Sequence, residues 1–151
     1  MTNPALSIII PTLNEERYLP TLLTDLSRQT YRDFEVIIVD GHSTDRTVAK
    51  ANLFAHRLPL FKIVASPVRD VCRQRNLGAG EARGQTLLFL DADNRIAPHF
   101  LLGLKYRQEQ SKTDFFTTWV KAEENNLASQ AADPLINLYM ESQKNTPSPF
   151  G

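Results

Sequence analysis

The stretch Leu87-Leu88-Phe89-Leu90-Asp91-Ala92-Asp93-Asn94 places two carboxylates directly after an apolar run. Four consecutive apolar residues predict a strand that is buried on both faces of a sheet. Ligands of open α/β sheets collect at the carboxyl ends of the strands, which is where Asp91 and Asp93 should lie. Two such carboxylates can share a hard cation, and the cation can hold a diphosphate. The stretch therefore predicts a metal and nucleotide site, with an ordinary solvated turn as the alternative.

Three earlier segments of the chain have the same character as this strand. Each is short and apolar and is bounded by turn residues, which is typical of a strand. Helical periodicity fills the intervals between them, so strands and helices alternate. The predicted strands cover residues 6–11, 34–40, 60–65 and 86–90, and the predicted helices cover about residues 15–28, 45–56 and 70–82.

Local residue types mark the expected ends of these helices. The markers are Asn14 as a cap with Glu15 and Glu16 in the first turn, Thr44 or Asp45 as the start of the second helix, and Gly84 as a left-handed stop after the third. The alternation predicts an α/β fold, with a largely parallel sheet and helices on both of its faces.

The pattern changes after Asp93. We expect a helix over residues 98–110, an edge strand over 115–122, a second helix over 127–143 and a final loop. The sequence stops without an obvious terminal element. We therefore expect a fold that is incomplete at its C-terminus.

Composition excludes several classes of protein. The chain has 151 residues, 42% of them hydrophobic and 23% charged, which is ordinary for one globular domain. Its 17 basic and 17 acidic residues cancel, so no net field attracts nucleic acid or an anionic membrane. Cys72 is the only cysteine, and we expect it to be a buried or half-buried hydrophobe. No signal peptide or membrane span is evident, and a cytoplasmic location is the default expectation.

Chemically suggestive residues follow all four predicted strands. In a parallel sheet these strand ends share one edge, so the groups should converge there. The groups are Pro11-Thr12-Leu13-Asn14-Glu15-Glu16, then Asp40-Gly41-His42-Ser43-Thr44-Asp45, then Arg69, Arg73, Arg75 and Asn76, and finally Asp91-Ala92-Asp93. Such a rim can hold a base, a ribose and a diphosphate together.

Four ordered motifs in this sequence resemble glycosyltransferase family 2. They are Ser7-Ile8-Ile9-Ile10-Pro11-Thr12-Leu13-Asn14-Glu15, Val39-Asp40-Gly41-His42-Ser43-Thr44-Asp45-Arg46-Thr47, Arg75-Asn76-Leu77-Gly78 and the D-x-D motif in Phe89-Leu90-Asp91-Ala92-Asp93. The resemblance covers about the first hundred residues. It implies a Rossmann-like GT-A fold and an inverting enzyme that uses nucleotide-activated sugars. It also implies one domain over residues 1–151, with donor-binding βα units in 1–97 and the start of an acceptor-side region in 98–151.

The resemblance also implies roles for single residues. Pro11, Thr12, Asn14 and Glu15 would line the nucleoside pocket. Asp40 would accept a hydrogen bond from the base, usually the uracil imide, and capping of the second helix is its alternative role. Ser43, Thr44 and Asp45 suit that cap better than they suit a ligand.

The remaining implied roles concern the diphosphate. Arg73 and Asn76 share a helical face, so Arg73 is the expected phosphate partner, while Arg75 is expected to point elsewhere. Asp91 would lie nearer the ribose and Asp93 nearer a Mn²⁺ or Mg²⁺ ion. That metal would act as a Lewis acid on the departing nucleoside diphosphate.

Inverting transfer also needs a general base, and the sequence does not identify one. Glu123-Glu124 comes too early for the family pattern, and Asp114, Asp133 and Glu141 lack supporting context. A truncated, non-catalytic nucleotide-binding module is therefore the alternative to a transferase. A phosphoacceptor receiver domain fits poorly, because Glu15-Glu16 is a weak match to its acidic pair and its lysine is missing. The Gly-rich opening loop of sugar-phosphate nucleotidyltransferases is absent after Ile10.

The expected partners follow from the resemblance. The donor would be a nucleotide sugar, with uridine favoured as its base, and the acceptor would be an unknown saccharide or lipid-linked molecule. We expect no nucleic acid partner. Peripheral association with the inner face of the membrane, through regions outside this chain, stays open.

Overall fold

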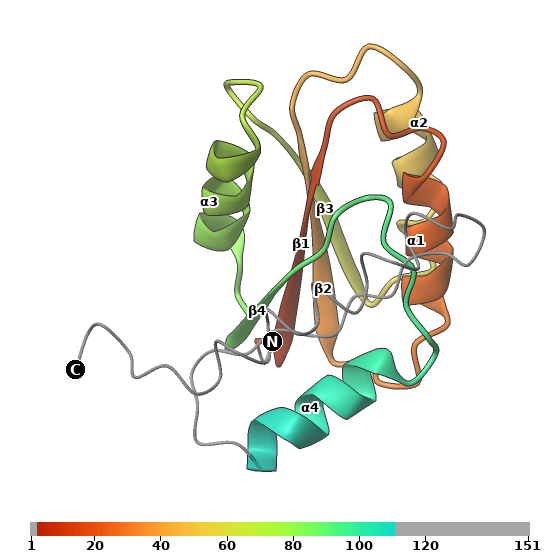
Figure 1. Cartoon of the computed structure of the whole chain (residues 1–151), viewed down its shortest axis with the longest axis vertical. Coiled ribbons are helices and arrows are strands. Elements are labelled where there is room, and N and C mark those ends of the chain that lie inside the picture. Colours follow the sequence, from red (N-terminus) through yellow and green to blue (C-terminus); the bar gives the residue numbers. More distant parts are fainter. Residues whose placement is uncertain (1–2, 111–151) are drawn as a thin grey trace, which may run out of the picture. The chain divides into compact units, whose positions relative to one another are not determined.

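The computed structural model describes residues 3–110, and within them four strands form one parallel sheet (Figure 1). The strands are β1 (Leu6–Thr12), β2 (Phe34–Asp40), β3 (Leu60–Ala65) and β4 (Thr86–Phe89), in the spatial order β3-β2-β1-β4. The predicted bounds of β2 and β3 are confirmed, and those of β1 and β4 differ by one residue. The sheet is parallel throughout, as the alternation of strands and helices predicted.

Strand register brings the polar strand ends to one edge. Thr12, the last residue of β1, lies opposite Asp40, the last residue of β2. On the other side of β1, Ile9 lies opposite Phe89, and the amide of Leu90 still donates to the Ile9 carbonyl at 3.1 Å. The chain therefore leaves β4 beside β1, with Asp91 and Asp93 following at the carboxyl edge.

Helices lie on both faces of the sheet, as predicted. They are α1 (Leu19–Ser27), α2 (Thr47–Asn52), α3 (Val71–Glu81) and α4 (Phe100–Gln110). Figure 1 shows α3 on one side of the strands and α1 with α2 on the other. Alternate residues of the central strands face opposite sides, so Ile8 and Ile38 belong to the cluster with α1, while Ile9 and Val39 pack with α3.

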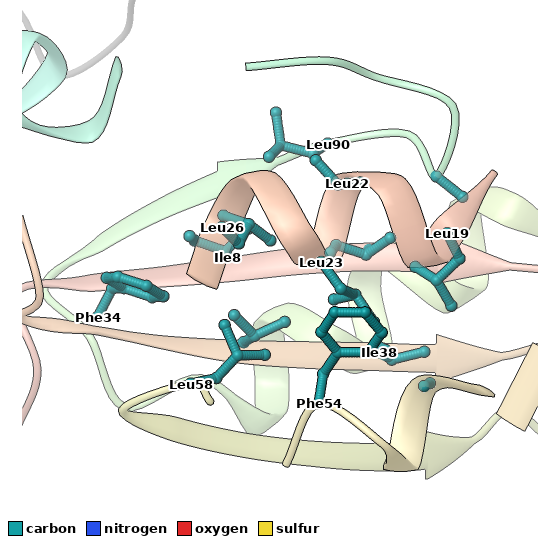
Figure 2. Packing of buried hydrophobic residues seen from close by; sticks show 14 of the residues in the cluster. Ile8, Leu19, Leu22, Leu23, Leu26, Phe34, Ile38, Phe54, Leu58 and Leu90 are labelled. Carbon is teal, nitrogen blue, oxygen red and sulfur yellow. The ribbon is translucent and has the colours of Figure 1, made fainter. Parts of the chain in front are cut away.

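The larger core lies between the sheet and α1. Leu22, Leu23 and Leu26 of α1 are fully buried, because they repeat at the spacing that places them on one helical face. Figure 2 shows these leucines beside Ile8 and Ile38 of the sheet. This packing holds β1 and β2 rigidly where they deliver their terminal polar residues.

The starts of α1 and α2 were predicted too early. α1 begins at Leu19 with Tyr18 as its N-cap and has no acidic residue in its first turn, so Asn14, Glu15 and Glu16 do not cap or charge it. Asn14 instead adopts a left-handed conformation, with φ of 58°. α2 covers only Thr47–Asn52 and has Arg46 at its N-cap position. The polar residues before both helices bond across to each other instead.

Gly84 does not act as the left-handed stop that the sequence suggested. The C-cap of α3 is Ala82 in an extended conformation, and no glycine with a positive φ occurs in residues 3–110. Gly84 is needed for close approach, because a Cβ there would lie 2.6 Å from the backbone nitrogen of Ser7. The glycine lets the turn before β4 touch the start of β1.

Cys72 is exposed, which corrects its expected burial. It lies on the side of α3 away from the sheet, since Gln74 and Gly78 are the buried residues of that helix. The predicted strand over 115–122, the helix over 127–143 and the final loop lie outside the described residues. In the part of the chain that the structure describes, no helix has the length and apolar character needed to cross a membrane.

Two glycines of α3 should respond in opposite ways to substitution by alanine. A Cβ at Gly78 would lie 2.4 Å from Ile9 Cγ2, whereas a Cβ at Gly80 meets nothing within 4 Å. We expect Gly78→Ala to lower the free energy of unfolding by about 1–3 kcal/mol through overpacking. Gly80→Ala should raise it by about 0.5–1 kcal/mol, because alanine loses less backbone entropy in a helix. Urea unfolding of both variants tests this, and equal effects would contradict the close packing of α3.

Candidate functional site

Asp40 is a buried carboxylate at the carboxyl edge of the sheet, and it accepts three hydrogen bonds. Its Oδ1 accepts from Ser43 Oγ at 2.6 Å and from Thr12 Oγ1 at 3.2 Å. Its Oδ2 accepts from the Ser43 amide at 2.9 Å. These bonds fix the carboxylate in one orientation and shape the turn after β2. They do not cap α2, because Ser43 precedes that helix.

The loops after β1 and β2 are joined through Asn14. Its Oδ1 accepts from the Thr44 amide at 2.8 Å, and its own amide donates to Ser43 Oγ at 2.9 Å. Asn14 is one of the non-glycine residues with a positive φ, and this conformation turns the chain so that both bonds form. The expected pocket-lining residues Thr12 and Asn14 therefore lie beside Asp40.

A second set of bonds joins the same two loops further from the sheet. The Glu16 amide donates to Asp45 Oδ2 at 3.1 Å, and the Glu15 amide donates to Thr47 Oγ1 at 2.7 Å. Asp45 Oδ1 accepts from the Thr47 amide at 2.9 Å and from the Thr47 hydroxyl. Although burial raises the pKa of Asp45, the hydrogen bonds from Thr47 and from the Glu16 amide lower it overall. Asp45 thus holds the turn before α2 to the β1 loop, but Arg46, and not Thr44 or Asp45, occupies the N-cap position of that helix.

Glu15 connects this edge to the D-x-D motif. Its pKa is raised by burial first, then by the negative charges of Asp93, Asp45 and Asp91 in that order. The charges of the D-x-D pair can act on Glu15 only because β4 delivers them next to the β1 loop. The structure thus gathers acidic groups from three loops at one edge, where they create a concentrated negative potential.

Arg75 of α3 forms an ion pair with the first of these aspartates. Its Nη2 lies 2.6 Å from Asp91 Oδ1, and both side chains are partly exposed. The expectation that Arg75 points elsewhere was therefore wrong. Its Nε atom is buried and has no hydrogen-bond partner. The Asp91 amide also donates to Asn94 Oδ1 at 2.9 Å, which closes the turn around the motif.

Two other polar residues of α3 are exposed to solvent. Arg73 and Asn76 are exposed on this helix, and α3 is capped by Asp70, whose Oδ1 accepts from the Arg73 amide at 2.7 Å. Before the helix, Arg69 Nη2 donates to the carbonyl of His42 at 3.2 Å. Arginines of α3 and of the segment before it therefore lie near the carboxyl edge, and one of them, Arg75, pairs directly with the acidic group Asp91.

Sequence patterns missed two sets of buried polar residues that hold this edge. Gln74 bonds the ends of β1 and β2 through the carbonyls of Thr12 and Val39. On α1, Asp25 accepts from Arg95 Nε at 2.7 Å and from the Ile96 amide at 3.3 Å. Gln29 donates to the Ala97 carbonyl at 2.7 Å. These bonds attach the segment after the D-x-D motif to α1 and to the residues just after it. No local sequence motif predicts this attachment.

The carboxylate oxygens at this edge suit a hard divalent cation that also binds the phosphates of a ligand. Within residues 3–110, no group of three or more His, Cys, Asp or Glu side chains could hold a metal ion. Mg²⁺ is usually held by one or two carboxylates together with substrate phosphates, and not by an all-protein cage. Asp93 is exposed and is close enough to Glu15 to raise its pKa. A cation beside Asp93 would offset that negative potential, so the residues present fit such an ion.

Glu15→Gln should change the pH dependence of stability. A raised carboxyl pKa means that the folded chain keeps a proton that the unfolded chain loses above the ordinary value of 4.5. Stability therefore falls as the pH rises from about that value through the folded pKa. We expect Glu15→Gln to be more stable than the unsubstituted chain at pH 7 and equally stable at pH 4. Urea unfolding at both pH values measures this, and an equal difference at the two would refute it.

Comparison with known proteins identifies the family. A family model described as "Glycosyl transferase family 2" matches residues 7–148, so this chain belongs to glycosyltransferase family 2. A PGL/p-HBAD biosynthesis glycosyltransferase of Mycobacterium bovis is 44% identical over 97 residues. The match covers 64% of this chain but only 38% of that protein. The matched residues therefore span well under half the length of that relative.

Solved structures support the same fold. Staphylococcus aureus TarS matches with a TM-score of 0.66 and 25% identity, over 78% of this chain and 24% of TarS. The mannosyltransferase PcManGT of Pyrobaculum calidifontis, solved with GDP-Man and Mn²⁺, matches with a TM-score of 0.56 and 30% identity, over 62% and 28% of the two chains. Glucosyl-3-phosphoglycerate synthase of Mycobacterium tuberculosis, solved with Mn²⁺ and UDP, gives 0.51 and 26%, over 67% and 37%. These neighbours are GT-A glycosyltransferases, which confirms the predicted fold class.

Proposed function

We propose that this chain carries the donor-binding part of an inverting, metal-dependent glycosyltransferase that takes a UDP-sugar. The observation that carries this proposal is the convergence at one sheet edge. A fixed carboxylate on β2 lies there with an acidic pair after β4, and an arginine of α3 pairs with the first of its aspartates. Groups of these kinds at one edge can together bind a base, a ribose and a diphosphate. Family membership and the donor complexes of the structural neighbours support the same conclusion.

Asp40 is proposed to recognise the base. A carboxylate offers acceptors and no donor, so it suits the imide N–H of uracil. Guanine also presents N–H groups, and one structural neighbour was solved with GDP-Man, so GDP-sugars are the main competing donors. Thr12 and Ser43 hold Asp40 in place by hydrogen bonds, and its orientation is thus set before a ligand binds.

Asp93, with Asp91, is proposed to hold the Mn²⁺ or Mg²⁺ ion of the donor complex. When bound, the ion supplies Lewis acidity to the departing nucleoside diphosphate. Arg75 pairs with the Asp91 carboxylate, and the Asp91 amide bonds to Asn94, so the start of the motif is held in place for its proposed contact with the ribose. Arg73 and Asn76, exposed on the same helix as Arg75, are proposed to face the diphosphate.

We propose a saccharide or lipid-linked acceptor, at the cytoplasmic face of the membrane. In the family, the region that bears the general base follows the donor site, and the donor-side groups proposed here all lie within residues 3–110. A nucleotide-binding module without catalysis is the competing proposal, because no general base is assigned among the residues that the structure describes.

One experiment separates these proposals. The full chain is mixed with UDP-glucose, UDP-GlcNAc or GDP-mannose, with Mn²⁺ or with EDTA. Donor binding is measured, together with hydrolysis of the donor, in which water takes the sugar and free nucleoside diphosphate is released. Release that requires Mn²⁺ and a UDP-sugar supports the transferase. Binding without release supports the module, and a preference for GDP-mannose would move the base assignment to guanine. Absence of binding to every donor would refute both proposals.

A further inference from the structure

Gln74 is a buried polar side chain at the centre of the candidate site. It is only 3% exposed, although it is part of a helix whose other polar residues point largely to solvent. Its Nε2 donates to the Thr12 carbonyl at 2.9 Å and to the Val39 carbonyl at 2.7 Å. One amide group thus bridges the ends of β1 and β2, where the base-binding residues begin.

These contacts leave the β1 end with little freedom. The Thr12 carbonyl also accepts from the Gly41 amide at 2.8 Å. A carbonyl oxygen has two lone pairs, so Thr12 has no acceptor left on its backbone for a ligand. A Cβ at Gly41 would lie 3.2 Å from the amide of Gln74, which shows how closely the turn after β2 packs on it. The Thr12 carbonyl is therefore taken up by contacts within the protein, and the charged group beside it is the Asp40 carboxylate.

Gln74 reaches the strand ends because α3 lies unusually close to the sheet. Gly78, one helical turn later on the same face, allows this approach, since a Cβ there would lie 2.4 Å from Ile9 Cγ2 and 3.0 Å from Val39 Cγ2. Gln74 and Gly78 are the buried residues of α3. The glycine sets the distance between helix and sheet, and the glutamine sets the position of the helix along the strands.

We propose that Gln74 is a positioning residue that aligns the nucleoside subsite with the phosphate-facing side of α3. This proposal rests on the proposed function, which assigns Asp40 to the base and Arg73 to the diphosphate. Arg73 and Arg75 are the sequence neighbours of Gln74, so any shift of Gln74 against Thr12 and Val39 moves both arginines relative to Asp40. A residue that only filled space would not need a donor directed at both carbonyls.

Gln74→Met tests this proposal, because methionine is unbranched and of similar length but donates no hydrogen bond. The matched control is Ser7→Ala. Ser7 is also buried, donating to Glu35 Oε1 at 2.6 Å and accepting from the Gly84 amide at 2.8 Å. It lies on the same strand as Thr12 but about 16 Å away at the other end. Both variants lose buried hydrogen bonds, and only Gln74→Met loses them beside the site.

The readout is the Kd for UDP, measured by calorimetry on the full chain with and without Mn²⁺, beside the unfolding midpoint of each variant. We expect Gln74→Met to raise the Kd at least about 10-fold under both conditions, which corresponds to the loss of about one good hydrogen bond. Ser7→Ala should lower stability but keep the Kd within 2-fold. A Kd within 2-fold for Gln74→Met, or equal changes in both variants, would overturn the positioning role.

Amide hydrogen exchange tests the structural role of Gln74 without a bound nucleotide. Loss of the Gln74 bridge should speed exchange of the Gly41 and Ser43 amides about 10-fold more than Ser7→Ala does. If the unsubstituted chain binds no UDP, the proposed function fails. The exchange rates then decide whether Gln74 holds the Asp40 turn, and equal rates in the two variants would refute that.

Discussion

Asp93→Asn should remove the Mn²⁺-dependent part of UDP binding while the chain stays folded. Loss of groups that merely orient a metal ligand costs 10–100-fold in metal affinity, so loss of a ligand itself should cost at least about 100-fold. Asp93 is exposed, and we expect no loss of stability from its neutralisation, because the substitution also relieves repulsion with Glu15. Calorimetry with UDP in Mn²⁺ and in EDTA measures the metal-dependent part.

Asp33→Asn is the matched control for this experiment. Asp33 is also an exposed aspartate, but it precedes β2 and therefore lies at the amino edge of the sheet. Both variants change the net charge by the same amount, so a general electrostatic effect would appear in both. Unchanged metal dependence in Asp93→Asn would reject the assignment of Asp93 as a metal ligand. Equal losses in the two variants would reject it as well.

The sheet could be predicted from the sequence because its information is local. β2 and β3 are apolar runs between turn residues, and their predicted bounds are those observed. The helix starts could not be predicted in the same way. Asn14 has the residue type of a cap, but its partner is the amide of Thr44, thirty positions away, and not an amide of the following helix. A side chain with two possible partners cannot be assigned from the residues next to it.

The sequence predicts the place of those site residues that follow directly from the strand order of the sheet. Parallel strands deliver their ends to one edge, so Asp40 and Asp91 were expected at the same edge, and the structure places Asp40 at the end of β2 and Asp91 just after β4. The orientation of Arg75 was predicted wrongly because its partner, Asp91, follows the next strand. The helical positions of Arg75 and its neighbours say nothing about where that strand lies. Gln74 left no signal at all. The buried face of α3 consists of a glutamine and a glycine, so hydrophobic periodicity does not reveal it.

Asp40→Asn should abolish the preference of the site for UDP over a derivative that lacks the imide proton of uracil. Asparagine keeps the volume but replaces one acceptor by a donor, which would oppose either the Ser43 amide or the imide of uracil. A hydrogen bond to a charged group contributes about 1.5–3 kcal/mol, so we expect the Kd for UDP to rise about 10- to 100-fold. Asp40 is buried, and the unfolding midpoint of the variant must be measured in parallel.

A modified ligand separates loss of recognition from loss of structure. The N3-methyl derivative of UDP lacks the imide proton, so it should bind the unsubstituted chain about as weakly as UDP binds Asp40→Asn. Combining both changes should add little further loss, because each removes the same hydrogen bond. Ser43→Ala provides the control, since it removes a hydroxyl bond to Asp40 but leaves the carboxylate in place. If Asp40→Asn still prefers UDP over its methyl derivative as strongly as the unsubstituted chain does, Asp40 does not bind the imide, and the nucleoside must lie elsewhere along the edge.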